Sequence, residues 1–141
     1  REVVPTGVIC VNINDWMYAH VHYGEEESDR LITIVADILK RNADAQTIIG
    51  RVDGDIFHVL MPLSEEEEVQ EYCRKIEEDC LQFQDDKLAL SVATGYVIKT
   101  NVEEDFDQLF SDAEYVMFEH KLQIKNAPGY RERLEKGSNL K

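Results

Sequence analysis

Residues 48–61 read IIGRVDGDIFHVLM, and this stretch decides the fold. Two β-rich runs, residues 48–52 and 55–61, flank the dipeptide Asp53-Gly54. An Asp-Gly pair between two such runs is the strongest short-range hairpin signal, because a type I′ turn needs positive φ at both central residues. We therefore predict a β-hairpin whose turn is Asp53-Gly54.

The segments before the hairpin predict a buried strand and an amphipathic helix. Residues 7–13 (GVICVNI) form a short apolar, β-branched run, which is typical of a buried strand. Residues 15–23 are mixed and aromatic, and we expect one or two helical turns there. From Ser28 onward, apolar residues recur at helical spacing: Leu31, Ile34, Val35, Ile38 and Leu39.

After the hairpin the pattern predicts a helix, a strand and a second helix. Ser64, with Glu67 three residues later, is a capping box that predicts a helix start. Residues 88–98 predict one strand, or two strands that pivot near Gly95. The last amphipathic helix is carried by Phe106, Leu109, Phe110, Ala113 and Met117. This order predicts an α+β fold: a central, mostly antiparallel sheet flanked by helices, with the hairpin near its centre.

Composition and charge limit the partners. The 141 residues are 43% hydrophobic and 31% charged, and the net charge is -14. Such a surface repels nucleic-acid phosphates and anionic lipid, so we expect no nucleic-acid binding and no membrane insertion by this domain. The acidic runs, residues 25–27, 65–68 and 103–105, are interpreted as solvated loop and helix-start residues.

The chain is expected to hold one domain, residues 1–125, followed by a polar tail, residues 126–141. Pro128 and Gly129 break any continuation of the last helix. Three cysteines without a CxxC pair favour a reducing, cytoplasmic compartment, and Cys73 and Cys80 are interpreted as core residues. The chain begins with Arg1 rather than Met, which suggests a fragment of a longer protein.

Acidic and amide side chains gather at two predicted strand ends. Asp53 and Asp55 crowd the hairpin turn, and the first strand ends in the sequence NIND at residues 12–15. If that strand lies beside the hairpin, these residues meet at one edge of the sheet. Carboxylates gathered in this way hold two magnesium ions in polymerase-like enzymes. The alternative, favoured by spacing alone, is ordinary turn chemistry, since Asp and Gly tolerate turn dihedrals.

Four further residues could have a functional role or an ordinary structural one. His20 and His22 lie beside acidic residues 25–27, but their spacing suits a metal site on a strand better than on the expected helical turn. His58 is interpreted as a packed or surface histidine. Trp16 is interpreted as a core or partner-facing residue.

Five blocks in the same order resemble the GGDEF family of diguanylate cyclases, which make cyclic di-GMP. Residues 51–57 (RVDGDIF) resemble the family signature R-x-G-G-D/E-E-F. Residues 12–17 (NINDWM) lie where the family carries D-x-D-x-F-K, and residues 23–29 (YGEEESD) resemble Y-G-H-x-x-G-D. Residues 91–96 resemble the strand around S-x-G, and residues 113–121 (AEYVMFEHK) resemble A-D-x-A-M-Y-x-A-K. The resemblance covers residues 7–125 and implies the palm, ferredoxin-like sheet of nucleotide cyclases.

The departures from the family pattern fall on groups that bind metal and phosphate. The family's metal-binding aspartate falls on Asn12, its signature glutamate on Ile56, and its first signature glycine on Asp53. Its phosphate-binding lysine falls on Met17 and its guanine-reading asparagine on His20. Losing one preorganised charge contact commonly costs about 3 kcal/mol, near a hundredfold in rate, and several are lost here. The resemblance therefore implies a domain without cyclase activity.

The resemblance also implies a remnant nucleotide site. The remnant signature comprises Asp53, Gly54, Asp55, Ile56 and Phe57, and the remnant nucleotide contacts are Asp29, Gly54, Lys121 and Lys125. Asp55 is the remaining acidic metal ligand, with Asn12 and the Ile13 main chain expected nearby. No cofactor is therefore required, and Mg²⁺ or Mn²⁺ is expected to bind only weakly, together with nucleotide. The family's inhibitory R-x-x-D site falls on residues 44–47. Asp44 stands at the position of the arginine and Thr47 at that of the aspartate, so neither site residue is present.

The leading hypothesis is a catalytically inactive regulatory or interaction domain of a larger bacterial signalling protein. Its expected partners are other domains of the same protein, and a homodimer is left open. The first rival is a weak nucleotide hydrolase that uses Asp55 and a loosely held metal. The second is a receptor that binds GTP or ATP without turning it over.

Overall fold

The computed structural model describes residues 5–83 and 90–130. Its elements follow in the predicted order: β1 (Thr6–Ile13), α1 (Trp16–Tyr23), α2 (Glu25–Arg41), β2 (Ile48–Asp53), β3 (Ile56–Pro62), α3 (Glu66–Gln82), β4 (Val92–Lys99) and α4 (Phe106–Lys125). The described part of the chain holds no helix long and apolar enough to cross a membrane.

The described strands form one antiparallel sheet in the order β2-β3-β1-β4. β1 pairs with β3 on one side and with β4 on the other, so Asn12 lies opposite Ile56. The α+β fold and the hairpin beside the first strand are confirmed. The expectation that the whole hairpin lies near the centre is wrong in one respect, because β2 forms an edge of the sheet.

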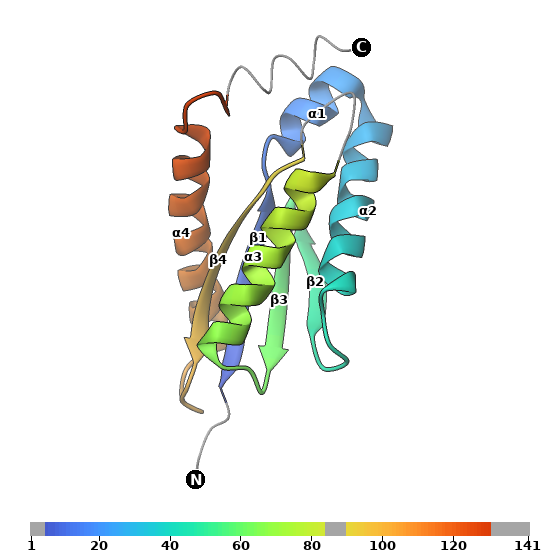
Figure 1. Cartoon of the computed structure of the whole chain (residues 1–141). Coiled ribbons are helices and arrows are strands. Elements are labelled where there is room, and N and C mark those ends of the chain that lie inside the picture. Colours follow the sequence, from blue (N-terminus) through green and yellow to red (C-terminus); the bar gives the residue numbers. More distant parts are fainter. Residues whose placement is uncertain (1–4, 84–89, 131–141) are drawn as a thin grey trace.

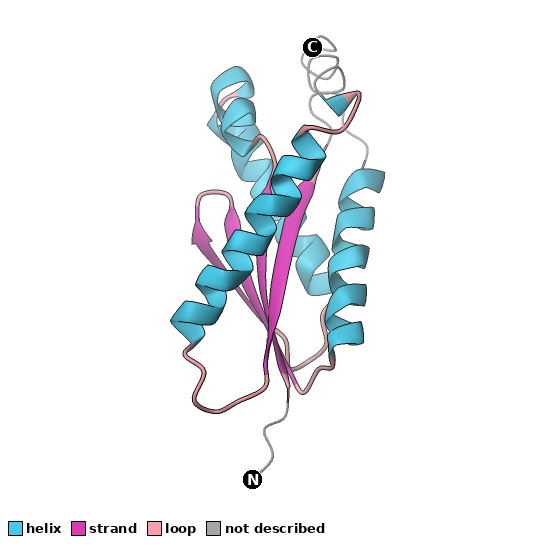
Figure 2. Ribbon diagram, turned by 90° about the vertical axis from the view of Figure 1, so that its left-hand side faces the viewer, coloured by secondary structure: helices cyan, strands magenta, loops and turns pink. Residues whose placement is uncertain are grey.

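Helices cover both faces of the sheet (Figure 1). Alternate β1 residues Ile9, Val11 and Ile13 pack into the larger core together with α2 and α3. Cys10 points to the other face, where a smaller core forms with Ala93 and the α4 residues Ala113 and Met117. Figure 2 shows α4 crossing in front of the strands on this second face.

Close contact between α4 and β4 depends on Gly95. A Cβ atom at this position would lie 2.2 Å from the Met117 nitrogen and 2.4 Å from the Ala113 carbonyl oxygen. Both are backbone atoms, so the helix itself would have to move. Gly95 therefore fixes how near α4 lies to the sheet, and β4 runs through it as one continuous strand rather than two. Residues 88 and 89 of the predicted strand lie outside the described residues.

The hairpin turn differs from the predicted type I′ turn at Asp53-Gly54. β2 includes Asp53, β3 begins at Ile56, and Gly54-Asp55 form the turn. Neither Gly54 nor Asp55 has a positive φ. The pairing between β2 and β3 instead shifts between Arg51 and Asp53, and this irregularity absorbs the extra residue.

Two helix starts also differ from the prediction. α2 begins at Glu25 rather than near Ser28, and acidic residues 25–27 form its first turn. Their negative charges stabilise the helix start, because the N-terminus is the positive end of the helix dipole. Glu27 is not solvated as expected: it is 4% exposed and pairs with Arg30 at 2.9 Å. The capping box of α3 is Glu65 with Glu68, one residue after the predicted pair.

The cysteines of the described chain are free and buried, as expected for Cys73 and Cys80. Burial is the main cause that raises the thiol pKa of Cys10, Cys73 and Cys80 to about 12. Thiolate is therefore scarce at neutral pH, and none of the three is poised as a nucleophile.

Candidate functional site

The end of β1 meets the hairpin turn, as the sequence predicts. The Ile13 N–H donates to the Asp55 carbonyl oxygen at 2.9 Å, and the Asn12 amide nitrogen Nδ2 donates to the same oxygen at 3.3 Å. Asn12 is 2% exposed. The position that the resemblance assigns to a metal-binding carboxylate thus holds a buried amide that donates to the turn.

The turn satisfies its own polar groups. The Gly54 N–H donates to Asp53 Oδ1 at 2.8 Å. Arg51 Nε donates to the carbonyl oxygens of Asp53 and Gly54, at 3.2 and 3.1 Å. The glycine N–H that could face a phosphate is therefore occupied by the carboxylate of the preceding residue.

The last two signature residues lie on opposite faces of the sheet. Phe57 is 3% exposed and belongs to the larger core. Ile56 packs against the smaller core beneath α4. Both side chains contribute to packing, and neither supplies a metal ligand.

Trp16 covers the signature glycine. A Cβ atom at Gly54 would lie 3.1 Å from Cζ3 and 3.2 Å from Cη2 of the indole ring. The indole N–H donates to the Ser28 carbonyl oxygen at 3.0 Å, and the ring stacks on His20 with centroids 5.7 Å apart. Trp16 therefore links α1 and α2 to the turn, so the interpretation as a packing residue fits its contacts.

Lys121 and Lys125 lie in the last turns of α4, close to the acidic groups of this edge. Lys125 Nζ is 3.3 Å from Asp15 Oδ1. Burial, followed by the charge of Lys125, lowers the pKa of Lys121, and the charges of Asp55 and Asp15 partly offset this. The structure thus brings both lysines and Asp55 into one electrostatic neighbourhood.

Asp15 was expected at this edge together with residues 12–14, but the sequence reasoning gave it no role of its own. It lies next to the block at residues 12–14 but at a position where the family pattern has no defined residue. Its pairing with Lys125 comes from the packing of α4 and carries no local sequence signal.

Asp29, Met17 and His20, further positions of the family pattern, make no hydrogen bond or ion pair with the hairpin or the α4 lysines among the described residues. Asp29 is exposed in the first turns of α2, and within the described residues no hydrogen bond or ion pair joins its side chain to the hairpin. Met17 is 59% exposed. In α1, His20 Nδ1 contacts Ser28 Oγ at 3.1 Å.

The metal reading of His20 and His22 gains no support. His22 Nδ1 donates to the Tyr18 carbonyl oxygen at 3.0 Å, and its ring stacks on the Tyr18 ring. Of the residues that the structure describes, neither histidine joins a group of three or more ligand atoms close enough for one ion.

The residues at the end of β1 do not fit a pair of magnesium ions. Magnesium prefers hard oxygen ligands in octahedral geometry. The expected set contributes the Asp55 carboxylate and the Asn12 amide oxygen Oδ1, which is buried and has no hydrogen-bond partner among the described residues. One carboxylate and one neutral oxygen fit a single weakly held ion, whereas a two-metal centre needs more negative charge.

One cleft lies outside the remnant nucleotide contacts. It has a volume of about 260 Å³ between the end of α4 and the start of β4, with Leu81, Leu90 and Ile124 in its lining. Asp15 reaches it, but Asp29, Gly54, Asp55 and Lys121 do not line it. The remnant nucleotide contacts therefore do not share this cleft.

Comparisons with known proteins agree with this arrangement. A family model described as diguanylate cyclase, GGDEF domain, matches residues 1–127. The active GGEEF domain of a diguanylate cyclase from Vibrio cholerae is 14% identical, with a TM-score of 0.77, over 84% of this chain and 78% of that chain. The GGDEF domain of DgcB from Caulobacter crescentus, solved in complex with c-di-GMP, is 16% identical, with a TM-score of 0.78, over 84% and 73%.

A third similar structure is the diguanylate cyclase SiaD from Pseudomonas aeruginosa, solved in complex with its activator SiaC. It is 13% identical, with a TM-score of 0.77, and the match covers 85% of this chain but only 47% of that chain. At such identities the likeness to solved structures establishes the fold.

Proposed function

The chain belongs to the GGDEF family of diguanylate cyclase domains, and from that premise we propose that it is a regulatory or interaction domain that does not make cyclic di-GMP. The observation that carries the proposal is the contact between Asn12 and Asp55. Where the reaction would need a carboxylate to hold metal, a buried amide donates to the Asp55 carbonyl oxygen at 3.3 Å. A neutral amide supplies no negative charge to hold a cation at this place.

Two further contacts support the loss of catalysis. The Gly54 N–H is taken by Asp53, which also adds a negative charge beside the turn. Lys125 is neutralised by Asp15. A polyphosphate at this edge would therefore find these hydrogen-bond donors already occupied, and nearby carboxylates would repel it.

The proposed regulatory role rests on the family and on an analogy with one similar structure. GGDEF domains occur in larger proteins, and SiaD was solved with an activator protein. By analogy, the domain would act through other domains of the same bacterial, cytoplasmic signalling protein or through a second copy of itself.

The second candidate function is a nucleotide receptor. One observation in its favour is that Lys121 lies near enough to Asp55 and Lys125 for their charges to affect its pKa. Another is that the Asn12 oxygen Oδ1 has no hydrogen-bond partner among the described residues. In this reading GTP or ATP binds weakly at Gly54, Lys121 and Lys125, with Asp29 reading the base and one Mg²⁺ or Mn²⁺ ion at Asp55. A weak nucleotide hydrolase would use the same groups.

Two measurements on the purified chain distinguish these functions. Calorimetric titrations with GTP, ATP and cyclic di-GMP, each with and without Mg²⁺ or Mn²⁺, separate a receptor from a domain that binds only protein. Product analysis of the GTP and ATP mixtures separates a receptor from a hydrolase. The proposal predicts no cyclic di-GMP in any mixture.

A further inference from the structure

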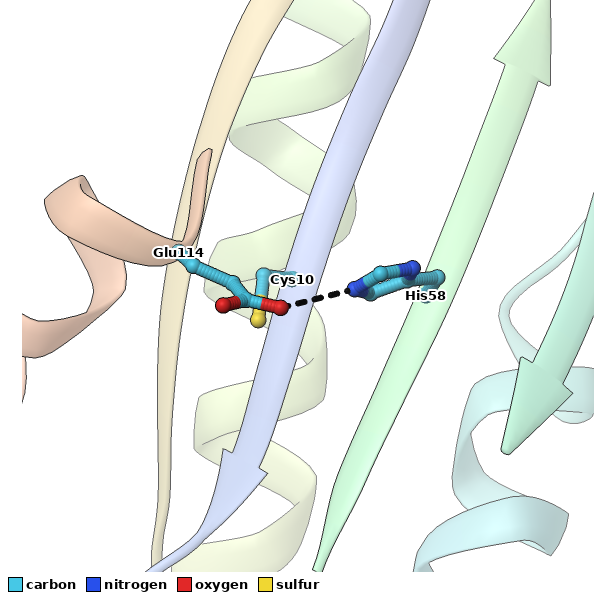
Figure 3. A group of neighbouring side chains, drawn as sticks. All are labelled: Cys10, His58 and Glu114. Atoms are coloured by element: carbon cyan, nitrogen blue, oxygen red, sulfur yellow. Dashed lines mark hydrogen bonds and ion pairs between the residues drawn. The ribbon is translucent and has the colours of Figure 1, made fainter. Parts of the chain in front are cut away.

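Three side chains with metal-binding atoms converge between the sheet and α4, next to the remnant signature along the strands. Cys10 comes from β1, His58 from β3 and Glu114 from α4, and Figure 3 shows them pointing toward one another. The cysteine sulfur, a histidine ring nitrogen and a glutamate carboxylate oxygen all lie within 4.8 Å of one another. His58 Nε2 and Glu114 Oε2 are 3.3 Å apart.

Packing around the trio holds each member in place. Cys10 is wholly buried in the smaller core. The His58 ring stacks on Phe110 of α4, with centroids 4.0 Å apart and an interplanar angle of 7°. Glu114 follows Ala113, whose carbonyl oxygen lies against Gly95 in the close contact between α4 and β4. The backbone positions of the cluster are therefore set by three packed elements, two strands of the sheet and α4.

We propose that Cys10, His58 and Glu114 bind a divalent cation of the zinc type, as a site separate from the remnant nucleotide site. Thiolate, imidazole and carboxylate are the three kinds of ligand that Zn²⁺ accepts, and a site with three protein ligands leaves the fourth position open for water. The sulfur ligand selects against Mg²⁺ and Ca²⁺, which prefer oxygen.

The exposure of the three side chains gives the ion a route. Cys10 is buried at the inner end, whereas the His58 side chain is 19% exposed and that of Glu114 is 40% exposed. An ion entering beside Glu114 would reach the sulfur last. Zinc-to-ligand bond lengths place two ligand atoms on one ion about 3.3–3.6 Å apart, and the His58–Glu114 pair, at 3.3 Å, already has this spacing.

Binding of an ion at Cys10 would be coupled to loss of the thiol proton. Burial, with the nearby charges of Glu114 and Asp55, raises the pKa of Cys10 to about 12, so without metal the thiol keeps its proton. A zinc-type ion deprotonates a coordinating thiol outright. Binding at neutral pH would therefore release a proton from Cys10, and the bound ion would link β1, β3 and α4.

The test titrates the purified chain with Co²⁺, a spectroscopic substitute for Zn²⁺, and then with Zn²⁺ as competitor. We expect thiolate-to-cobalt charge-transfer absorption that saturates at one ion per chain, proton release in weak buffer, and displacement of Co²⁺ by Zn²⁺ but not by Mg²⁺. His58→Gln and Glu114→Gln should each weaken binding at least about 100-fold, since loss of even an outer partner costs 10–100-fold. Cys10→Ala should abolish the charge-transfer band.

Two matched control variants show whether the ion binds at this cluster or at another thiol or histidine. Cys80→Ala removes another buried thiol, and His22→Gln removes a histidine beside the acidic residues 25–27; both should leave binding unchanged. The proposal is overturned if wild type gives no charge-transfer band, or if the band survives in both His58→Gln and Glu114→Gln. If Cys10→Ala does not fold, as judged by circular dichroism, these two variants still decide the matter, because both side chains are partly exposed.

Discussion

Lys125 Nζ lies 3.3 Å from Asp15 Oδ1, so the end of α4 is tied to the turn that follows β1. The Asp15 side chain is 13% exposed and that of Lys125 is 36% exposed. Asp15 has a left-handed backbone, with φ of 59°, which aspartate and asparagine both adopt more readily than most residues. The lysine that the family resemblance assigns to phosphate is thereby engaged by an acid of the same chain.

Replacing Asp15 with asparagine should strengthen GTP binding. Asp15→Asn keeps the left-handed backbone, releases Lys125 and removes a negative charge from the approach of the phosphates. Ion pairs of this exposure contribute up to about 1 kcal/mol, so we expect a dissociation constant about two- to fivefold lower by calorimetry. The control is Asp37→Asn, which makes the same change in net charge on α2. Equal affinities for the two variants would contradict the assignment of Lys125 to the phosphates.

Nucleotide binding should be weak and should require both lysines of α4. A net charge of -14 repels polyphosphate at long range, and two charge-assisted contacts of roughly 1.5–3 kcal/mol each suggest dissociation constants from high micromolar to millimolar. Lys121→Ala with Lys125→Ala should abolish calorimetric binding of GTP, whereas Lys40→Ala with Lys75→Ala, the charge-matched control, should preserve it. Low-micromolar binding, or binding that survives the first pair of changes, would place the ligand elsewhere.

The contact between Gly54 and Trp16 can be measured with a double-mutant cycle. Gly54→Ala pushes a methyl group against the indole ring, whose nearest atom lies 3.1 Å from the new Cβ, and should lower the free energy of unfolding by about 1 kcal/mol. In a Trp16→Ala background the same change should cost nothing. Gly50→Ala, in the same hairpin, meets no atom within 4 Å and should be neutral or slightly stabilising. An equal cost of Gly54→Ala in both backgrounds would show that Trp16 does not cover the turn.

Gly95→Ala should be far more damaging than either hairpin change. Its Cβ would collide with backbone atoms of Met117 and Ala113, which no side-chain rotation relieves, so α4 would have to shift. We expect a loss of about 3 kcal/mol or more in urea denaturation, with Gly50→Ala as the matched control. A loss below 1 kcal/mol would mean that α4 is not held against β4 as closely as described.

The sequence predicts the order of elements well because apolar periodicity and β-branched runs act locally. It also predicts that Asn12 lies near Asp55, through the Asp-Gly hairpin and the family pattern. The turn type was wrong because an irregularity in β2 absorbs a residue, and no local signal marks it. The pair Asp15 with Lys125, and the cover of Trp16 over Gly54, depend on how α1 and α4 pack, and such long-range contacts leave no periodic trace.

The most direct test of the central claim is an assay for cyclic di-GMP. The chain is incubated at high concentration with GTP and Mg²⁺ or Mn²⁺, because the family reaction joins two GTP molecules held by facing domains. An active GGDEF domain serves as positive control, and Asp55→Asn shows whether any turnover belongs to this chain. The account predicts no cyclic di-GMP above background from wild type or variant. Clear formation by wild type that disappears in Asp55→Asn would contradict it.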